Sequence, residues 1–212
     1  MPTTAATLTF LLGSVAFILV PGPSVLFIVG RALAHGRRAA LASVAGNCAG
    51  VSVLIVAVAF GAGEVAERSV AAFTVLKLVG AAYLCYLGIH TFRTRGDLAA
   101  ALGAAPGPAA DRRVFAQGVL VGVTNPKAVV LFAAVLPQFA DPAVGNPATQ
   151  MLVLGLLFVL TASVLDSVWG LAAGTARNWF ATSPQRLRRL GGAGGLMMIV
   201  MGAGLAVSGR RD

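Results

Sequence analysis

Apolar residues occupy this chain in six long runs, which short polar connections separate. A helix needs about 20 predominantly apolar residues to cross the hydrocarbon core of a bilayer. Because the runs have about this length, the pattern predicts an all-α membrane protein with six transmembrane helices, forming a single domain over residues 1–212. We expect the spans at about 7–30, 40–63, 70–92, 115–138, 150–174 and 190–208.

The composition supports this interpretation. Hydrophobic residues make up 58% of the chain and charged residues only 11%, with a mean hydropathy of +0.87. Soluble domains usually carry about 25% charged residues. Such a chain has too few polar residues to cover a soluble fold, so the lipid bilayer is its expected surroundings.

The net charge of +9 is unevenly distributed between the two sides of the predicted bundle. Lys and Arg collect in the short cytoplasmic loops of membrane proteins. The split therefore predicts that both termini lie outside the membrane, on the side away from the cytoplasm, and it argues against nucleic acid as a partner. Eleven arginines fall on one side, namely Arg31, Arg37, Arg38, Arg93, Arg95, Arg112, Arg113, Arg177, Arg186, Arg188 and Arg189, and three on the other, Arg68, Arg210 and Arg211.

The longest polar connection runs from Arg93 to Arg113 and contains Pro106 and Pro108. Proline lacks a backbone N–H and restricts its neighbour, so this stretch is expected to be a cytoplasmic linker at about 94–114. It separates half one, at about 1–93, from half two, at about 115–212. With three spans in each half, the second half enters the membrane from the opposite side, which predicts two inverted three-helix repeats.

Each half carries an interruption near the middle of its first span. Half one contains Pro21-Gly22-Pro23, and half two contains Asn125-Pro126. The apolar runs that follow, Ser24–Phe27 and Val129–Phe132, are similar. Matched breaks in the two halves indicate a transporter binding site, so the first and fourth helices are expected to be broken there, with Ser24 as part of the site.

The breaks predict a particular chemistry. A proline leaves the carbonyl four residues earlier without its helical partner, which would free the carbonyls of Phe17, Leu19 and Gly122. Freed carbonyls suit an ammonium group, while the new half-helix offers unpaired N–H groups to a carboxylate. An amino acid carries both groups. The alternative is a plain kink without a site, which membrane helices tolerate.

Ionisable residues within membrane spans are expensive and therefore functional candidates. Lys127 directly follows the second break, and Asp166 lies deep in the fifth span. They could form a structural ion pair, or serve as a substrate contact and a site of ion coupling. Lys77 is a further coupling candidate, although its side chain could instead extend to the membrane surface.

Other features distinguish between rival functions. Cys48 and Cys85 both lie in half one without a C-x-x-C motif, which disfavours a membrane thiol-disulfide electron carrier and favours packing roles. No His, Asp and Glu cluster has metal-ligand spacing, which disfavours a metal-ion exporter, and no nucleophile–base motif suggests an enzyme. No cofactor or metal site is expected. Asn47 could be a site residue or a link between helices.

Four G-x-x-x-G pairs allow close helix packing, either within the chain or in a homodimer. They are Gly46/Gly50, Gly118/Gly122, Gly170/Gly174 and Gly191/Gly195.

Together these motifs resemble the LysE/RhtB family of bacterial amino-acid exporters, which includes threonine, homoserine and lysine efflux translocators. The resemblance rests on the order and spacing of Pro21-Gly22-Pro23, Gly30-Arg31 to Gly36, Lys77 to Gly88, and Asn125-Pro126-Lys127. It implies efflux of amino acids or close derivatives across the inner membrane, driven by protons or the membrane potential. It also implies site roles for the residues of both breaks, Lys127 and Lys77, but it assigns none to Asp166.

Overall fold

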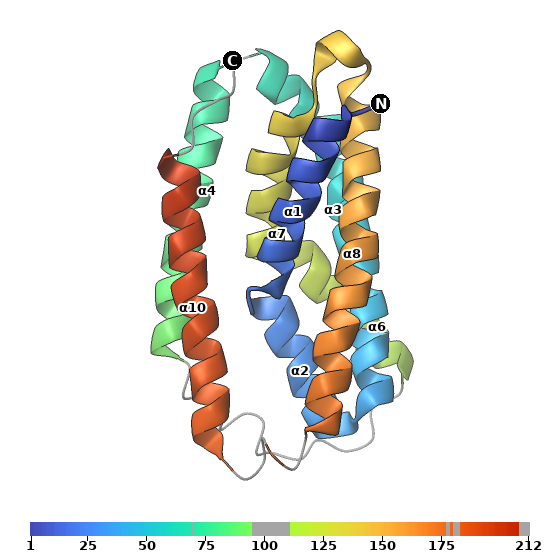
Figure 1. Cartoon of the computed structure of the whole chain (residues 1–212), viewed down its shortest axis with the longest axis vertical. Helices are drawn as coiled ribbons and strands as arrows, with labels where there is room; N and C mark the ends of the chain where they lie inside the picture. The colour runs from blue at the N-terminus through green and yellow to red at the C-terminus, as the bar shows by residue number, and fades with distance from the viewer. Residues whose placement is uncertain (69, 95–110, 177–178, 180–182, 208–212) are drawn as a thin grey trace.

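The structure is a computed structural model that describes residues 1–68, 70–94, 111–176, 179 and 183–207. Throughout this part of the chain, every regular element is a helix (Figure 1). The α-helices are α1 (Thr4–Leu19), α2 (Pro23–His35), α3 (Arg37–Arg68), α4 (Val70–Arg93), α6 (Asp111–Thr124), α7 (Pro126–Val130), α8 (Pro147–Thr175) and α10 (Pro184–Val207). A π-helix η1 (Leu131–Val135) and the 3-10 helices η2 (Leu136–Phe139) and η3 (Pro142–Val144) follow α7.

Length and composition support a multi-pass membrane protein. Residues Arg37–Gly61 of α3 and Pro147–Thr175 of α8 are each long and apolar enough to cross a bilayer. Two bent helix pairs also qualify when each pair is counted as one span, which gives two to four candidate spans in the described residues. The prediction of an all-α membrane protein is confirmed at this level.

One face of α8 is an exposed apolar surface of the kind that lipid chains cover. Leu156, Leu160, Val164 and Val168 recur every four residues, and each is more than half exposed. Residues at this spacing lie on one face of a helix. A continuous exposed apolar stripe is unfavourable in water and well suited to lipid chains.

The first break separates α1 from α2, and the two helix axes are bent by 49°. Val20 is the C-cap of α1, and Gly22 is the N-cap of α2 without a side-chain hydrogen bond. Pro23 occupies the first turn of α2, where its missing N–H leaves no helical bond unmade. The predicted interruption in the first helix is confirmed.

The second break separates α6 from α7, and the two segments 111–124 and 126–139 are bent by 41°. Here Asn125 caps the new helix, because its Oδ1 accepts a hydrogen bond of 3.1 Å from the backbone N–H of Lys127. Pro126 again occupies the first turn. The two breaks were predicted from the same proline signal, yet only the second is capped by its own side chain.

The glycine pairs of α3 and α6 pack against each other. A Cβ atom on Gly46 would overlap the carbonyl oxygen of Phe115, and one on Gly122 would overlap that of Asn47. Gly50 and Gly118 have equally close backbone neighbours on the opposite helix. These two pairs therefore serve packing within the chain, one of the two uses predicted for them.

Helices α4 and α10 lie side by side, and Figure 1 shows them at the left of the bundle. Gly88 and Gly195 face each other closely in this contact. The pair also touches both broken helices through glycine: Gly194 packs against the carbonyl of Pro21, and Gly80 packs against the side chain of Val130.

Three polar contacts tie helix ends together at the lower end of the bundle in Figure 1. They join the arginines around the α2–α3 turn to the start of α6 and the end of α8. The pairs are Arg38–Asp111 at 2.7 Å, Arg31–Gln117 at 2.7 Å and Arg37–Thr175 at 2.9 Å. These three arginines are among the eleven that the sequence assigns to the cytoplasmic side. Most of the predicted linker at 94–114 lies outside the described residues.

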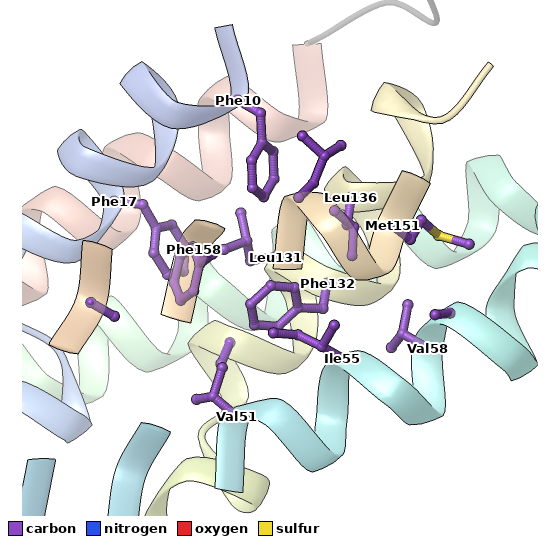
Figure 2. Packing of buried hydrophobic residues seen from close by; sticks show 14 of the residues in the cluster. Phe10, Phe17, Val51, Ile55, Val58, Leu131, Phe132, Leu136, Met151 and Phe158 are labelled. Carbon is purple, nitrogen blue, oxygen red and sulfur yellow. The ribbon is translucent and has the colours of Figure 1, made fainter. Parts of the chain in front are cut away.

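Two apolar clusters fill the interior. The first, shown in Figure 2, gathers Phe10, Phe17, Phe132, Phe158 and Met151 with their neighbours from α1, α3, α7 to η2, and α8. Its rings contact edge to face, for example Phe132 and Phe158 with centroids 4.9 Å apart. The second cluster joins α2 to the first turns of α3 and the end of α8. The polar residues of both breaks lie between these clusters.

Candidate functional site

Lys127 crosses from the second break to the first. It lies in the first turn of α7, is only 4% exposed, and its Nζ donates hydrogen bonds to the carbonyl oxygens of Phe17 at 2.5 Å and Val20 at 2.8 Å. These carbonyls belong to the last turn and C-cap of α1, where the break leaves them without helical partners. The negative end of the helix dipole favours a cation at the same place.

The Phe17 side chain completes the surroundings of the ammonium group. Nζ of Lys127 lies 4.2 Å from the centroid of the Phe17 ring, within the range of a cation–π interaction. The lysine stem passes Gly22, where an added Cβ would come within 3.0 Å of Cδ of Lys127. The first break therefore forms a cradle for an alkylammonium group, made of two carbonyls and one aromatic face.

A chain of buried hydrogen bonds links both breaks to α3. Nδ2 of Asn125 donates to Oγ of Ser24 at 2.6 Å, and Oγ of Ser24 donates to Oδ1 of Asn47 at 2.9 Å. Nδ2 of Asn47 lies 3.5 Å from Oδ2 of Asp166 on α8, the long end of the hydrogen-bond range. All four residues are at most 9% exposed. A buried and connected network of this kind fixes the relative positions of α2, α3, α7 and α8.

These polar groups line a small cavity of about 40 Å³ between the two apolar clusters. The charged side chains of Lys127 and Asp166 share its wall. A water molecule needs roughly 10–15 Å³, so the cavity has room for a few waters and not for an amino acid. The remaining lining residues are mostly apolar: Phe17, Ile18, Val20, Gly22, Val25, Cys48, Val51, Ala128, Phe158, Val159 and Ala162.

Most of the residues that the sequence singled out converge at this place. Gly22, Ser24, Asn125, Lys127 and Asp166 line the cavity. The three prolines shape the helix ends around it without lining it themselves: Pro21, Pro23 and Pro126. Lys77 lies in α4, and its side chain is outside the described parts of the structure.

Lys127 and Asp166 do not form a direct ion pair, although they share the cavity. Lys127 gives its hydrogen bonds to backbone carbonyls, whereas Asp166 contacts the amide of Asn47. The structural ion pair considered from the sequence is therefore not the arrangement seen here. The freed carbonyl predicted at Phe17 is confirmed, and the second acceptor is Val20 where the sequence predicted Leu19.

The structure gives two residues a more definite place in the site than the sequence did. Asn47 joins Ser24 to Asp166, and its signal was present as a polar residue in an apolar span. Cys48 lines the cavity and its Sγ approaches the carbonyl of Val159 at 4.0 Å, although only a packing role was expected. Nothing in the residue pattern indicated that the ring of Phe17 would face Lys127.

The family model described as LysE type translocator matches residues 15–209, which is nearly the whole chain. The chain belongs to the LysE type translocator family. The match includes both breaks, the α3 segment with Asn47 and the α8 segment with Asp166.

Several relatives align over most of their length. A homoserine/homoserine lactone efflux protein of Salmonella typhimurium is 34% identical over 197 residues, which cover 93% of this chain and 94% of that protein. An uncharacterized membrane protein of Vibrio cholerae is 34% identical over 202 residues, covering 95% of each. A leucine efflux protein of Klebsiella pneumoniae is 30% identical over 152 residues, covering 70% of each. No solved structure matches the chain.

Family membership establishes the general class of this LysE type translocator. It is a membrane transporter and not an enzyme. The buried cavity that Lys127 and Asp166 share is accordingly a candidate binding site for a transported molecule.

Proposed function

We propose that this protein exports amino acids or close derivatives across the bacterial cytoplasmic membrane. The observation that carries the proposal is the ammonium cradle at the first break, in a chain whose relatives are named as efflux proteins for homoserine, homoserine lactone and leucine. These three molecules share an α-amino group, whereas the lactone has no free carboxylate. Recognition in this chain is therefore proposed to centre on the ammonium group.

Each polar element has a proposed role. The carbonyls of Phe17 and Val20 receive the substrate ammonium, and the uncapped start of α2 at Gly22 and Ser24 faces the carboxylate or ester end. A helix N-terminus offers free N–H groups to such oxygens. The first break thus contacts both ends of the substrate, and the second break carries Lys127, whose ammonium occupies the cradle in this structure.

Alternating access between two inverted halves is the proposed transport cycle. In half one, α3 packs against α6 of half two; in half two, α8 packs against α1 and α2 of half one. This reciprocal packing supports six spans related by an inverted repeat, in which one half rocks against the other. Residues of both apolar clusters line the cavity, and in the proposed cycle the packing of each cluster loosens in turn.

Proton antiport is the proposed energy source, with Asp166 as the coupling group. Asp166 is a buried carboxylate within reach of the Asn47 amide, and the cavity that it lines has room for a few waters. Buried carboxylates at membrane depth commonly serve as proton relays in transporters. Lys77 remains a further coupling candidate from the sequence.

The proposed topology has both termini outside and the 94–114 linker in the cytoplasm, because eleven of the arginines fall on the side of this linker and three on the other side. A variant with Ala105→Cys, made in a background with Cys48→Ser and Cys85→Ser, should be labelled by a membrane-impermeant thiol reagent only after the cells are opened. Labelling of intact cells at this position would overturn the assigned orientation.

The function is tested directly by transport. The purified protein is reconstituted into liposomes. These are loaded with labelled homoserine, homoserine lactone, leucine, threonine, lysine or arginine, and efflux is measured with and without a proton gradient. At least one α-amino compound should leave the liposomes faster with the gradient. A panel that also includes divalent metal ions distinguishes the rival metal-ion exporter, and failure of every α-amino compound would refute the proposal.

A further inference from the structure

The position that should receive the substrate ammonium is already filled in this structure. Two of the three N–H donors of the Lys127 ammonium reach the carbonyls of Phe17 and Val20, and the ammonium also faces the Phe17 ring. A primary amine at the end of a four-carbon stem presents the same chemical group as the α-ammonium of an amino acid. The cradle therefore binds a substrate-like group that belongs to the protein itself.

Substrate cannot enter while Lys127 stays in place. The adjoining cavity of about 40 Å³ has room for only a few waters, and residues of both apolar clusters line it, among them Phe158 and Val25. The carbonyls can accept Lys127 or a substrate ammonium, because both would approach the same oxygen atoms. The second break carries Lys127 in the first turn of α7, so a movement of that half-helix would withdraw the ammonium.

We propose that Lys127 is a built-in stand-in for the substrate, which occupies the carbonyl cradle of the first break when the site is empty and leaves it when substrate binds. This inference rests on the proposed export of α-amino compounds. On leaving, the ammonium remains within the cavity that Asp166 lines, where an opposite charge is available. The carbonyls then have a donor with and without substrate, and the displaced lysine faces the ionised Asp166 carboxylate.

The stand-in explains how an exporter can return empty. A transporter that must leave buried carbonyls unpaired on the return step is restricted to exchanging one substrate for another, because unpaired buried acceptors are unfavourable. With Lys127 in the cradle, the empty carrier closes around a satisfied site. Lys127 is thereby assigned to net efflux and not to substrate exchange.

The test compares these two modes in the same proteoliposomes. Lys127→Met removes the ammonium but keeps a side chain of similar length. Net efflux into substrate-free medium should fall by roughly tenfold or more, because the empty carrier would close over unpaired carbonyls, while exchange against external substrate should persist within about twofold. Wild-type net efflux in Lys127→Met would overturn the inference.

Chemical rescue supplies a matched control. Lys127→Ala leaves space beside Gly22, so added ethylammonium should restore its net efflux, whereas the bulk of methionine should block rescue in Lys127→Met. Ethylammonium should also raise the thermal unfolding midpoint of purified Lys127→Ala and leave those of the wild type and Lys127→Met unchanged. Equal loss of net efflux and exchange without rescue would show that Lys127 contacts the substrate directly, which overturns the inference but not the exporter.

Two further outcomes are separable. If Lys127→Met does not accumulate in the membrane, Lys127→Arg decides, because it keeps a cation: its net efflux should stay in the wild-type ratio to its exchange, and a selective loss of net efflux would count against the stand-in. If the wild type moves no α-amino compound at all, the proposed function fails, whereas the thermal response of Lys127→Ala to ethylammonium still tests the cradle.

Discussion

The two helix breaks arise from the same kind of signal and end in different chemistry. At the first break, Gly22 has no side chain to cap α2, and the carbonyls at the end of α1 receive their donor from another helix. At the second break, Asn125 caps its own half-helix, and the side chain of Lys127, two residues later, extends to the first break. The first break thus provides hydrogen-bond acceptors, and the second break provides the donor.

This asymmetry matters for a transporter with related halves. Two equivalent breaks would offer two equivalent sites, whereas one accepting and one donating break join into a single site. The contact between Lys127 and the carbonyls of Phe17 and Val20 therefore joins the two halves at this site. Each variant below either removes this difference between the breaks or makes it easier to measure.

The largest effect is expected at Asp166, which the Asn47 amide connects to the hydrogen-bonded chain between both breaks. Asp166→Asn keeps the shape of the side chain but cannot release a proton. Proton-driven efflux should be abolished, while substrate-for-substrate exchange should partly survive, as measured in proteoliposomes with and without a gradient. Full proton-driven transport in this variant would end the coupling hypothesis, and equal loss of both modes would indicate a structural role.

Restoring helical N–H groups should affect the first break more than the second. A variant with Pro21→Ala and Pro23→Ala allows α1 and α2 to join and remove the cradle, so transport should fall by about tenfold or more while expression persists. Pro126→Ala should lose only about threefold, because the Asn125 cap, worth roughly 1 kcal/mol, still begins α7 there. Wild-type rates in both variants would mean that the prolines are plain kinks.

Smaller effects are expected from the hydroxyl that joins the breaks. Ser24→Ala leaves the amides of Asn125 and Asn47 without their shared partner, so the free energy of unfolding should drop by about 1–2 kcal/mol and transport by a few-fold. Ser14→Ala is the matched control, since this buried serine bonds only the Phe10 carbonyl of its own helix. Thermal unfolding in detergent and initial efflux rates measure both variants; identical behaviour would show that the Ser24 link is dispensable.

The smallest effect is expected at the cysteines. Both are free thiols, Cys48 on α3 and Cys85 on α4, and the hydrogen-bond partner of each Sγ is a backbone carbonyl. A double variant with Cys48→Ser and Cys85→Ser should therefore transport at close to the wild-type rate. A complete loss of function with normal expression would revive the thiol-disulfide carrier as a rival.

Much of this arrangement could be predicted from the sequence because it follows from the backbone. Proline removes a donor at a fixed position, so the breaks and the free carbonyl of Phe17 could be located without a structure. The glycine pairs likewise predicted close packing, and Gly46 and Gly122 show it between α3 and α6. These signals are local, or repeat at a helical period.

The partners of the exposed groups could not be predicted in the same way. The sequence indicated that Phe17 would need a donor and that Lys127 would need a partner, but more than one hundred residues separate them. Lys127 and Asp166 were considered as an ion pair because both are charged and buried. The structure instead gives the lysine to carbonyls, which requires the bend of α1 and α2 and the absence of a side chain at Gly22.

The small size of Gly22 makes the residue types at positions 22 and 127 depend on each other. Because the lysine stem passes where a side chain would stand, residues 22 and 127 share one volume. A relative with a larger residue aligned to Gly22 should carry a shorter side chain aligned to Lys127, and it should therefore have lost or relocated the cation. If the residue types at these two positions covary across many sequences of the family, the contact between them is maintained in evolution.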